Sequence, residues 1–230
     1  MKDVVVPEAV AQLAGLVGSD GDDIIATMDE RADSDGFPTV GPEVGGWLEL
    51  LARVSDAQRV FEFGSGFGYS AYWFARGLPA DGEVVLTEID EDELDLAREY
   101  FEAGGFAELA QFEHGDALDI VERYDGPFDI VLIDNEKHRY VDAFEAIRGK
   151  LRPGSLVVAD NAITAGTVVN RDEVVSLLAG ERSDGDVEED AISEGSRGIA
   201  RYLEHVRTQD DVDTVLLPLG EGLAVSLVRG

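Results

Sequence analysis

The chain has 230 residues, 44% of them hydrophobic and none a cysteine, which allows a sizeable core and excludes disulfides, thiolate metal sites and cysteine nucleophiles. No apolar run reaches the roughly 18 residues of a membrane helix, and the first residues lack a secretory signal pattern, so we expect a soluble cytoplasmic protein. The formal charge of −31 comes from acidic residues spread along the chain, which indicates the salt-rich cytoplasm of a halophilic archaeon rather than a basic partner.

Three helical segments are expected before the first strand. Apolar residues recur at helical spacing in residues 8–17 and in residues 22–32. A third segment begins near Pro42, a residue that favours the first turn of a helix, and continues to residue 54. Glycines and a proline in residues 33–41 predict a loop between the last two helices.

Strands and helices alternate along the rest of the chain. Apolar runs predict strands at residues 59–63, 83–89, 110–114, 128–133 and 155–159. The helices between them are expected to end at residue 75 and to span residues 91–103 and 140–151, the last closed by Arg152-Pro153-Gly154. Residues 215–219 and 223–228 have the pattern of an antiparallel pair.

This alternation predicts a single α/β domain over residues 1–230. The expected architecture is a Rossmann-like, doubly wound, mainly parallel seven-stranded sheet with an antiparallel C-terminal hairpin. An N-terminal helical segment, residues 1–54, precedes the core, residues 55–230. Residues 180–198 are rich in acid, serine and glycine, and we expect a mobile loop there, either a substrate lid or a solvated insertion.

A glycine loop joins the first predicted strand to the next helix, with the spacing Gly64-x-Gly66-x-Gly68. Glycine lets a ligand approach the backbone closely, and Tyr69 and Ser70 begin the helix that follows. The spacing differs from the G-x-G-x-x-G of dinucleotide-binding folds, so a nicotinamide enzyme is the less favoured interpretation.

Carboxylates stand at the ends of the first three predicted strands, at Glu62, Glu88 and Asp116. In open α/β sheets, ligands bind outside the carboxyl ends of the strands. Glu62 can hold a cationic amine but would repel a pyrophosphate, and Glu88 is placed to accept hydrogen bonds from ribose hydroxyls. S-adenosylmethionine has both groups, and Asp116 would then meet its adenine. The alternative is that Glu62 and Asp116 are only helix caps or turn formers.

Oxygen ligands follow the next two strands, with Asp134 after the fourth and the pair Asp160-Asn161 after the fifth. In the common strand order 3-2-1-4-5 these strands are neighbours about 4.8 Å apart, so the three side chains converge. This set suits Mg²⁺, whereas zinc favours nitrogen and sulfur ligands. The alternative is that Asp160 and Asn161 only form a turn.

Lys137, one of three lysines in the chain, follows Asp134 by three residues. Its retention beside a carboxylate cluster indicates a functional role. Near a divalent cation, like-charge repulsion favours the neutral amine, which can act as a general base. The alternative is an ordinary ion pair with Asp134 or Glu136.

Together these residues resemble the cation-dependent class I O-methyltransferases, the family of catechol and caffeoyl-CoA O-methyltransferases. The resemblance runs from about Val40 to the carboxyl terminus. The motifs that carry it are Glu62-x-Gly64 with Gly68-Tyr69-Ser70, Glu88, Asp134-x-x-Lys137-x-x-Tyr140, Ala159-Asp160-Asn161 and Leu217-Pro218-Leu219-Gly220-Glu221-Gly222-Leu223.

The resemblance implies methyl transfer from S-adenosylmethionine to a metal-bound hydroxyl of a small catechol-like or vicinal-diol acceptor. It implies Asp134, Asp160 and Asn161 as ligands of a divalent cation, most simply Mg²⁺, with Lys137 as the base beside Asp134. Contacts with the cofactor are expected from residues at the strand ends and the glycine loop: Val40, Glu62, Gly64, Gly66, Gly68, Tyr69, Ser70, Glu88, Ile89, Asp116, Ala117 and Asp134.

Two other functions stay open from the sequence. Some relatives methylate a hydroxylated tRNA uridine, and Arg139, Arg171 and Arg197 are the candidates for the basic strip that RNA would need. A nucleotide-binding module without chemistry would not need Lys137. The resemblance also implies a homodimer through the N-terminal helices, to which Trp47 and Trp73 could contribute apolar surface.

Overall fold

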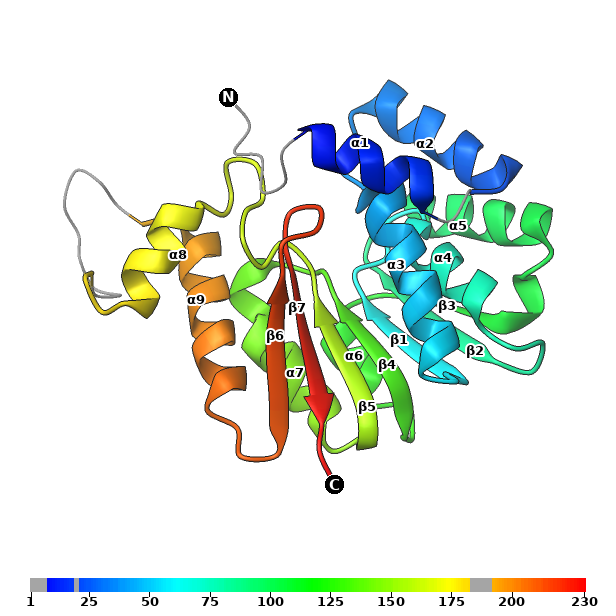
Figure 1. Cartoon of the computed structure of the whole chain (residues 1–230). Helices are drawn as coiled ribbons and strands as arrows, with labels where there is room; N and C mark the ends of the chain where they lie inside the picture. The colour runs from blue at the N-terminus through cyan, green and yellow to red at the C-terminus, as the bar shows by residue number, and fades with distance from the viewer. Residues whose placement is uncertain (1–7, 19–20, 183–191) are drawn as a thin grey trace.

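The computed structural model describes residues 8–18, 21–182 and 192–230. Its sheet contains the strands β1 (Arg59–Phe63), β2 (Glu83–Glu88), β3 (Ala110–His114), β4 (Phe128–Ile133), β5 (Leu151–Ala159), β6 (Val212–Leu217) and β7 (Leu223–Val228). They form one seven-stranded sheet in the order β3-β2-β1-β4-β5-β7-β6 (Figure 1). The strands β1 to β5 pair in parallel, and β7 pairs antiparallel with β5 and β6. The predicted fold class and the order 3-2-1-4-5 are confirmed.

Helices cover both faces of this sheet. They are α1 (Glu8–Val17), α2 (Asp23–Asp35), α3 (Gly41–Val54), α4 (Tyr69–Gly77), α5 (Glu91–Gly104), α6 (Ala117–Val121), α7 (Tyr140–Arg148), α8 (Arg171–Leu178) and α9 (Glu194–Arg207), with 3₁₀ turns η1 (Ala107–Leu109) and η2 (Lys137–Arg139). One core contains side chains of α2 to α5, and a second contains side chains of α6 to α9. Because β4 lies between the two cores, all six of its residues are buried, as its continuous apolar run predicts.

The predicted helix over residues 140–151 is too long. Helix α7 ends at Arg148, and β5 already begins at Leu151. Phe128 pairs with Leu151 and Ile130 with Leu156, so a step of two residues on β4 matches a step of five on β5. The extra residues form an irregularity inside β5, where the Ser155 hydroxyl donates to the Phe128 carbonyl at 2.6 Å. The proline and glycine that suggested a closing turn therefore lie within the bounds of β5.

The predicted loop over residues 180–198 extends too far toward the carboxyl terminus. Helix α9 begins at Glu194, after Ser193, whose side chain accepts a hydrogen bond from the Ser196 amide. Residues 183–191 lie outside the described part of the chain. The glycines of α9 misled the prediction, because glycine usually signals a turn. In α9 they permit close packing instead, as a side chain at Gly195 would lie 2.4 Å from the Val168 carbonyl oxygen.

Smaller differences concern caps and short elements. The Asp22 side chain caps the start of α2. The helix continues to Asp35 and is followed by its C-cap residue, Gly36, which has a φ of 66°. The loop expected from residue 33 therefore begins later. Strand β6 starts three residues before the predicted 215–219, at Val212. The helices α6 and α8 were not predicted; each is short, with at most eight residues, and offers little periodicity.

Apolar side chains are exposed on the N-terminal helices. Leu13, Leu16 and Val17 of α1 are 62%, 85% and 79% exposed. Trp73, by contrast, is fully buried, because α4 packs so closely on α3 that a side chain at Gly45 would overlap its indole ring. The expectation that Trp73 supplies dimer surface is therefore wrong, while the homodimer itself stays a prediction. None of the helices in the described ranges is long and apolar enough to span a bilayer.

Candidate active site

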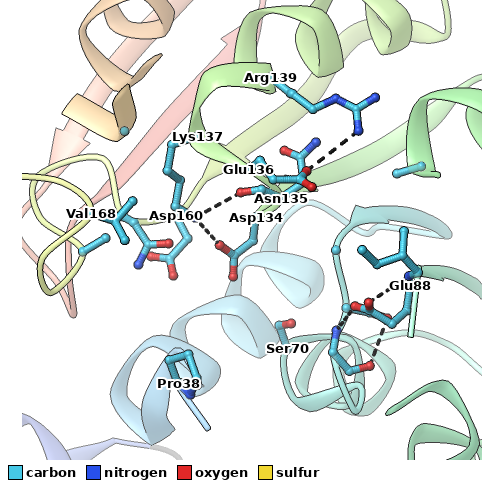
Figure 2. A pocket seen from close by; sticks show the side chains of 18 of the residues that line it. Pro38, Ser70, Glu88, Asp134, Asn135, Glu136, Lys137, Arg139, Asp160 and Val168 are labelled. Atoms are coloured by element: carbon cyan, nitrogen blue, oxygen red, sulfur yellow. Dashed lines mark hydrogen bonds and ion pairs between the residues drawn. The ribbon is translucent and has the colours of Figure 1, made fainter. Parts of the chain in front are cut away.

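The carboxyl ends of the parallel strands open into a cavity of about 1130 Å³. This volume exceeds the roughly 300–1,000 Å³ of an ordinary small-molecule site, so it has room for two ligands side by side. Figure 2 shows Ser70 and Glu88 at one end of it, and Asp160, Lys137 and Val168 at the other. Of the predicted site residues, all line the cavity except Glu62 and Gly68.

The glycine loop between β1 and α4 brings backbone to the cavity surface. Gly64 has a φ of 82°, and a side chain there would lie 2.8 Å from the Asp134 carbonyl oxygen. At Gly66 a side chain would lie 2.6 Å from the ring of Phe37, which belongs to the segment before α3. Gly68 instead faces Ala97 of α5 at 3.0 Å. The first two glycines therefore shape the cavity, and the third permits helix packing.

Glu88 at the end of β2 is held by backbone amides. One oxygen accepts from the Gly66 amide at 2.8 Å, and the other accepts from the amides of Ile89 and Asp90 at 2.8 and 3.0 Å. This fixes the carboxylate at the cavity wall, where the predicted ribose hydroxyls would meet it. The Ile89 side chain beside it is 67% exposed and offers an apolar surface to a flat ring.

Glu62 lies beneath the cavity rather than on its surface. Its side chain is fully buried, and the Ser70 hydroxyl, which lines the cavity, donates to its Oε1 atom. Its Oε2 atom has no hydrogen-bond partner among the described residues. Burial, with a smaller contribution from the nearby Asp134 and Glu88 carboxylates, raises the pKa of Glu62 to about 8, although the hydrogen bond from Ser70 lowers it. A cation reaching this carboxylate would pair with the oxygen that has no partner in the described part of the chain.

The Glu62 carboxyl makes the ligand-free fold sensitive to pH. Since its pKa is about 8 in the folded state against 4.5 in the unfolded chain, its stabilising contribution is complete below about pH 4.5 and is lost as the pH rises through 8. We expect Glu62→Gln to raise the free energy of unfolding at pH 8 by on the order of 1–3 kcal/mol while weakening S-adenosylmethionine binding. Urea unfolding measured across this pH range checks it, with exposed Glu99→Gln as control. Parallel curves for Glu62→Gln and wild type would contradict the expectation.

Asp116 serves as a helix cap, as the alternative interpretation stated. Its side chain accepts from the Leu118 amide at 2.9 Å at the start of α6 and from the Arg139 guanidinium at 2.8 Å. Burial raises the pKa of Asp116, but the hydrogen bonds from Arg139 and Leu118 outweigh it, so the pKa lies below its usual value. Asp116 and Ala117 still line the cavity, so the cap and an adenine contact are compatible.

The three proposed metal ligands follow adjacent strands. The sheet ladder continues through the Asp134 amide, which donates to Phe63, and the Asp160 amide, which donates to Ile133. Asn161 has a φ of 53°, a conformation that asparagine tolerates better than most residues, and its Nδ2 atom donates to Glu221 at 2.7 Å.

The electrostatics of these ligands fit a cation. The Oδ1 atom of Asp160, a residue only 4% exposed, has no hydrogen-bond partner in the described structure. Burial and the Asp134 carboxylate raise the pKa of Asp160 to about 8, and burial also raises the pKa of Asp134 despite Lys137. Within residues 8–18, 21–182 and 192–230, no three Asp, Glu or His side chains are arranged to hold a metal. The candidate set is instead two carboxylates and an amide, which suits Mg²⁺.

Lys137 on the turn η2 is held on three sides. Its Nζ atom donates to Asp134 Oδ1 at 2.8 Å, to the hydroxyl of Tyr140 at 2.8 Å and to the Asn135 carbonyl at 3.3 Å. The ion pair with Asp134, which the alternative interpretation expected, is present. Tyr140 is fully buried and donates in turn to the Asp160 carbonyl at 3.1 Å. The tyrosine thereby links the lysine to the end of β5.

Helix α9 supports η2 from behind. A side chain at Gly198 would lie 2.2 Å from the Lys137 carbonyl oxygen, so only glycine allows this approach. We expect Gly198→Ala to displace η2, to destabilise the fold by about 1–3 kcal/mol and to lower kcat for methyl transfer. Gly149→Ala is the matched control, because Gly149 has an ordinary helical φ and nothing within 4 Å of the added carbon. Thermal unfolding and kinetics of both variants check this expectation, and equal behaviour would contradict it.

Comparison with known proteins decides the family. The model of the O-methyltransferase family matches residues 27–229. The chain belongs to this O-methyltransferase family. A catechol O-methyltransferase from Niastella koreensis is 34% identical over 176 residues, which cover 74% of this chain and 79% of that protein. A catechol O-methyltransferase from Mycobacterium tuberculosis is 32% identical over 171 residues, 73% of this chain and 77% of that protein. The recognised family and the predicted enzyme class are confirmed.

Solved structures agree with the fold of this O-methyltransferase. An O-methyltransferase from Bacillus cereus in complex with SAH has a TM-score of 0.80 at 26% identity, covering 96% of this chain and 97% of that one. TomG from Streptomyces achromogenes, an O-methyltransferase of tomaymycin synthesis in complex with SAM, has a TM-score of 0.79 at 26% identity and full coverage of both chains.

Several residues of this O-methyltransferase site were not predicted to act in it. Tyr140 belonged to the recognised motif, and its spacing of three from Lys137 was a signal that the two side chains meet. From the sequence, Arg139 is a candidate contact only for RNA, whereas in the structure its guanidinium pairs with Asp116 at the cavity wall. Glu221 lay between two glycines of the hairpin, and nothing local indicated that it reaches Asn161. Phe37 comes from the distant N-terminal segment, so no sequence signal connected it with Gly66.

Proposed function

We propose that this O-methyltransferase transfers the methyl group of S-adenosylmethionine to one hydroxyl of a small catechol-like or vicinal-diol acceptor, with the help of a divalent cation, Mg²⁺. The observation that carries the proposal is that Asp134, Asp160 and Asn161 line the cavity beside Lys137, with the Asp160 Oδ1 atom buried and without a hydrogen-bond partner among the described residues.

S-adenosylmethionine fits the end of the cavity formed by β1 and β2. Glu88 would accept hydrogen bonds from the ribose hydroxyls, and Ile89 would pack on the adenine. Ser70, with Glu62 behind it, would receive the cationic amino-acid tail. The Bacillus cereus and Streptomyces achromogenes structures were solved with SAH and SAM, which supports the same cofactor here.

Asp134, Asp160 and Asn161 would hold the cation at the other end. When bound, a divalent cation acts as a Lewis acid that lowers the pKa of an acceptor hydroxyl. In its neutral amine form, Lys137 Nζ, held next to Tyr140, would accept the proton of that hydroxyl. The walls of the cavity would hold the nucleophilic oxygen and the methyl carbon at about 3 Å, which supplies much of the acceleration.

A hydroxylated tRNA uridine is a less favoured acceptor. Two of the three arginines considered for RNA already pair with carboxylates, Arg139 with Asp116 at 2.8 Å and Arg171 with Asp172 at 3.1 Å. An RNA backbone needs several cationic contacts, and these two side chains are committed elsewhere.

Product analysis tests the proposed function. The purified protein is incubated with methyl-labelled S-adenosylmethionine, Mg²⁺ and 4-methylcatechol, a neutral acceptor, in about 2 M KCl, where the Debye length is near ~2–3 Å and self-repulsion is screened. We expect a mono-O-methylated catechol by mass spectrometry. Tight S-adenosylmethionine binding without product from any diol would contradict the proposal.

A further inference from the structure

The acceptor end of the cavity is defined by residues around the proposed cation site. Val168 lies beside Asp160 and Lys137 in the close view (Figure 2). The Ser193 hydroxyl donates to the Val168 carbonyl at 2.8 Å, so the adjacent Glu194, which also lines the cavity, belongs to the same end.

Glu221 adds a further carboxylate to this end of the cavity, and backbone contacts fix its position. It lies in the loop between β6 and β7, where its carbonyl accepts from the amides of Ile163 and Thr164 at 3.2 and 3.0 Å. A side chain at the next residue, Gly222, would lie 2.3 Å from Ile163, so the loop sits directly on the segment after β5. Its Oε2 atom accepts from Asn161, and its Oε1 atom has no hydrogen bond to any of the described residues at the cavity wall.

The lysine and the arginine at the described cavity wall already form ion pairs with carboxylates. Lys137 and Arg139 are the only lysine and arginine that line the cavity among the described residues. Each forms an ion pair at 2.8 Å, with Asp134 and Asp116 respectively. An acceptor with an anionic tail would therefore meet Glu194 and Glu221 without an uncommitted lysine or arginine of the described cavity wall, whereas an ammonium tail could pair with Glu221 Oε1.

We infer that the acceptor is a neutral or cationic hydroxylated compound, with carboxylate-bearing acceptors disfavoured, and that Glu221 is the residue that sets this preference. The inference rests on the proposed function and deepens it.

Short-range contacts explain why the preference would survive in salt. At about 2 M KCl, charges more than ~3 Å apart are largely screened, so the overall charge of the protein contributes little. A contact ion pair at an exposed site is worth about twofold to fivefold in binding, and a like-charge contact costs a similar factor. We therefore expect kcat/KM for an ammonium-bearing catechol to exceed that for a carboxylate-bearing one by about 4- to 25-fold.

The experiment compares three catechols that differ in side-chain charge: dopamine, 4-methylcatechol and 3,4-dihydroxyphenylacetate. The kcat/KM values are measured in about 2 M KCl for wild type, Glu221→Gln and Glu108→Gln. Glu108 is the control because it is exposed and precedes the amino-terminal end of β3, whereas the cavity lies at the carboxyl ends of the strands. Calorimetric binding of each catechol to the SAH-loaded protein gives a second readout that needs no turnover. Ratios to 4-methylcatechol within each variant cancel any general loss of activity.

We expect the order dopamine, 4-methylcatechol, dihydroxyphenylacetate in wild type and in Glu108→Gln. In Glu221→Gln the ratio of dopamine to dihydroxyphenylacetate should fall at least threefold. An anionic catechol bound and methylated as well as dopamine would overturn the inference, and so would an unchanged ratio in Glu221→Gln. Absence of methylation of all three catechols would instead refute the proposed function.

Discussion

Replacing Lys137 with alanine is expected to lower kcat for methyl transfer by about 10²- to 10⁴-fold, the usual contribution of a general base. The reason is that Lys137 Nζ lies 2.8 Å from Asp134 Oδ1, beside the proposed cation site, and is held there by the Tyr140 hydroxyl. S-adenosylmethionine binding should change little, because its predicted contacts other than Asp134 do not bond to Lys137 and include Ser70 and Glu88 at the other end of the cavity. Single-turnover kinetics and calorimetric titration with SAH measure the two quantities separately.

Lys150→Ala is the matched control for this variant. Lys150 donates to the Tyr124 carbonyl at 2.9 Å and does not line the cavity. It should retain wild-type kcat. If Lys137→Ala retained more than about a tenth of wild-type kcat, the lysine would be only the ion-pair partner of Asp134, and its role as a base would be wrong.

Replacing Asp160 with asparagine is expected to lower the affinity for Mg²⁺ or Mn²⁺ by at least about 100-fold, because it removes one of two carboxylates from the proposed cation site. Since burial and Asp134 raise the pKa of Asp160 to about 8, protons compete with the cation at lower pH. Cation affinity in wild type should therefore rise as the pH increases toward about 8. Calorimetric titration of the protein with Mn²⁺ measures both effects without turnover.

Asp129→Asn distinguishes this effect from the loss of any buried carboxylate. Asp129 is also buried, but it lies at the amino-terminal end of β4 and pairs with Arg152 and the amides of Gln58 and Arg59. This variant should be less stable yet bind the cation with wild-type affinity. An Asp160→Asn protein that still binds Mn²⁺ as tightly as wild type would remove Asp160 from the proposed ligands.

The regular elements of the core could be read from the sequence because each has a strong local signal. The run Phe128–Ile133 is apolar throughout, and Gly64 directly follows β1, so the alternation of strands and helices was evident. The polar residues after β4 and β5 could also be predicted, because the ends of both strands were clear from the sequence. Parallel strands place their carboxyl ends at one edge, so Asp134 and Asp160 had to lie near one another once the strand order was correct.

The errors arose where packing overrides local preference. Gly195 and Gly198 are poor helix formers, yet they lie in α9 because the helix contacts the Val168 and Lys137 carbonyls. Arg152-Pro153-Gly154 has the composition of a turn, yet pairing with β4 draws it into β5. The contacts of Glu221 with Asn161 and of Phe37 with Gly66 join residues far apart in the chain, so no local pattern reports them.

Removal of the divalent cation tests the central claim most directly. Methyl transfer from S-adenosylmethionine to 4-methylcatechol is measured before and after exhaustive chelation with EDTA, and again after Mg²⁺ is restored, with S-adenosylmethionine binding followed in parallel. The account predicts that chelation lowers the rate by at least about 100-fold, that Mg²⁺ restores it, and that cofactor binding persists throughout. Transfer at an unchanged rate in EDTA would contradict the role assigned to Asp134, Asp160 and Asn161.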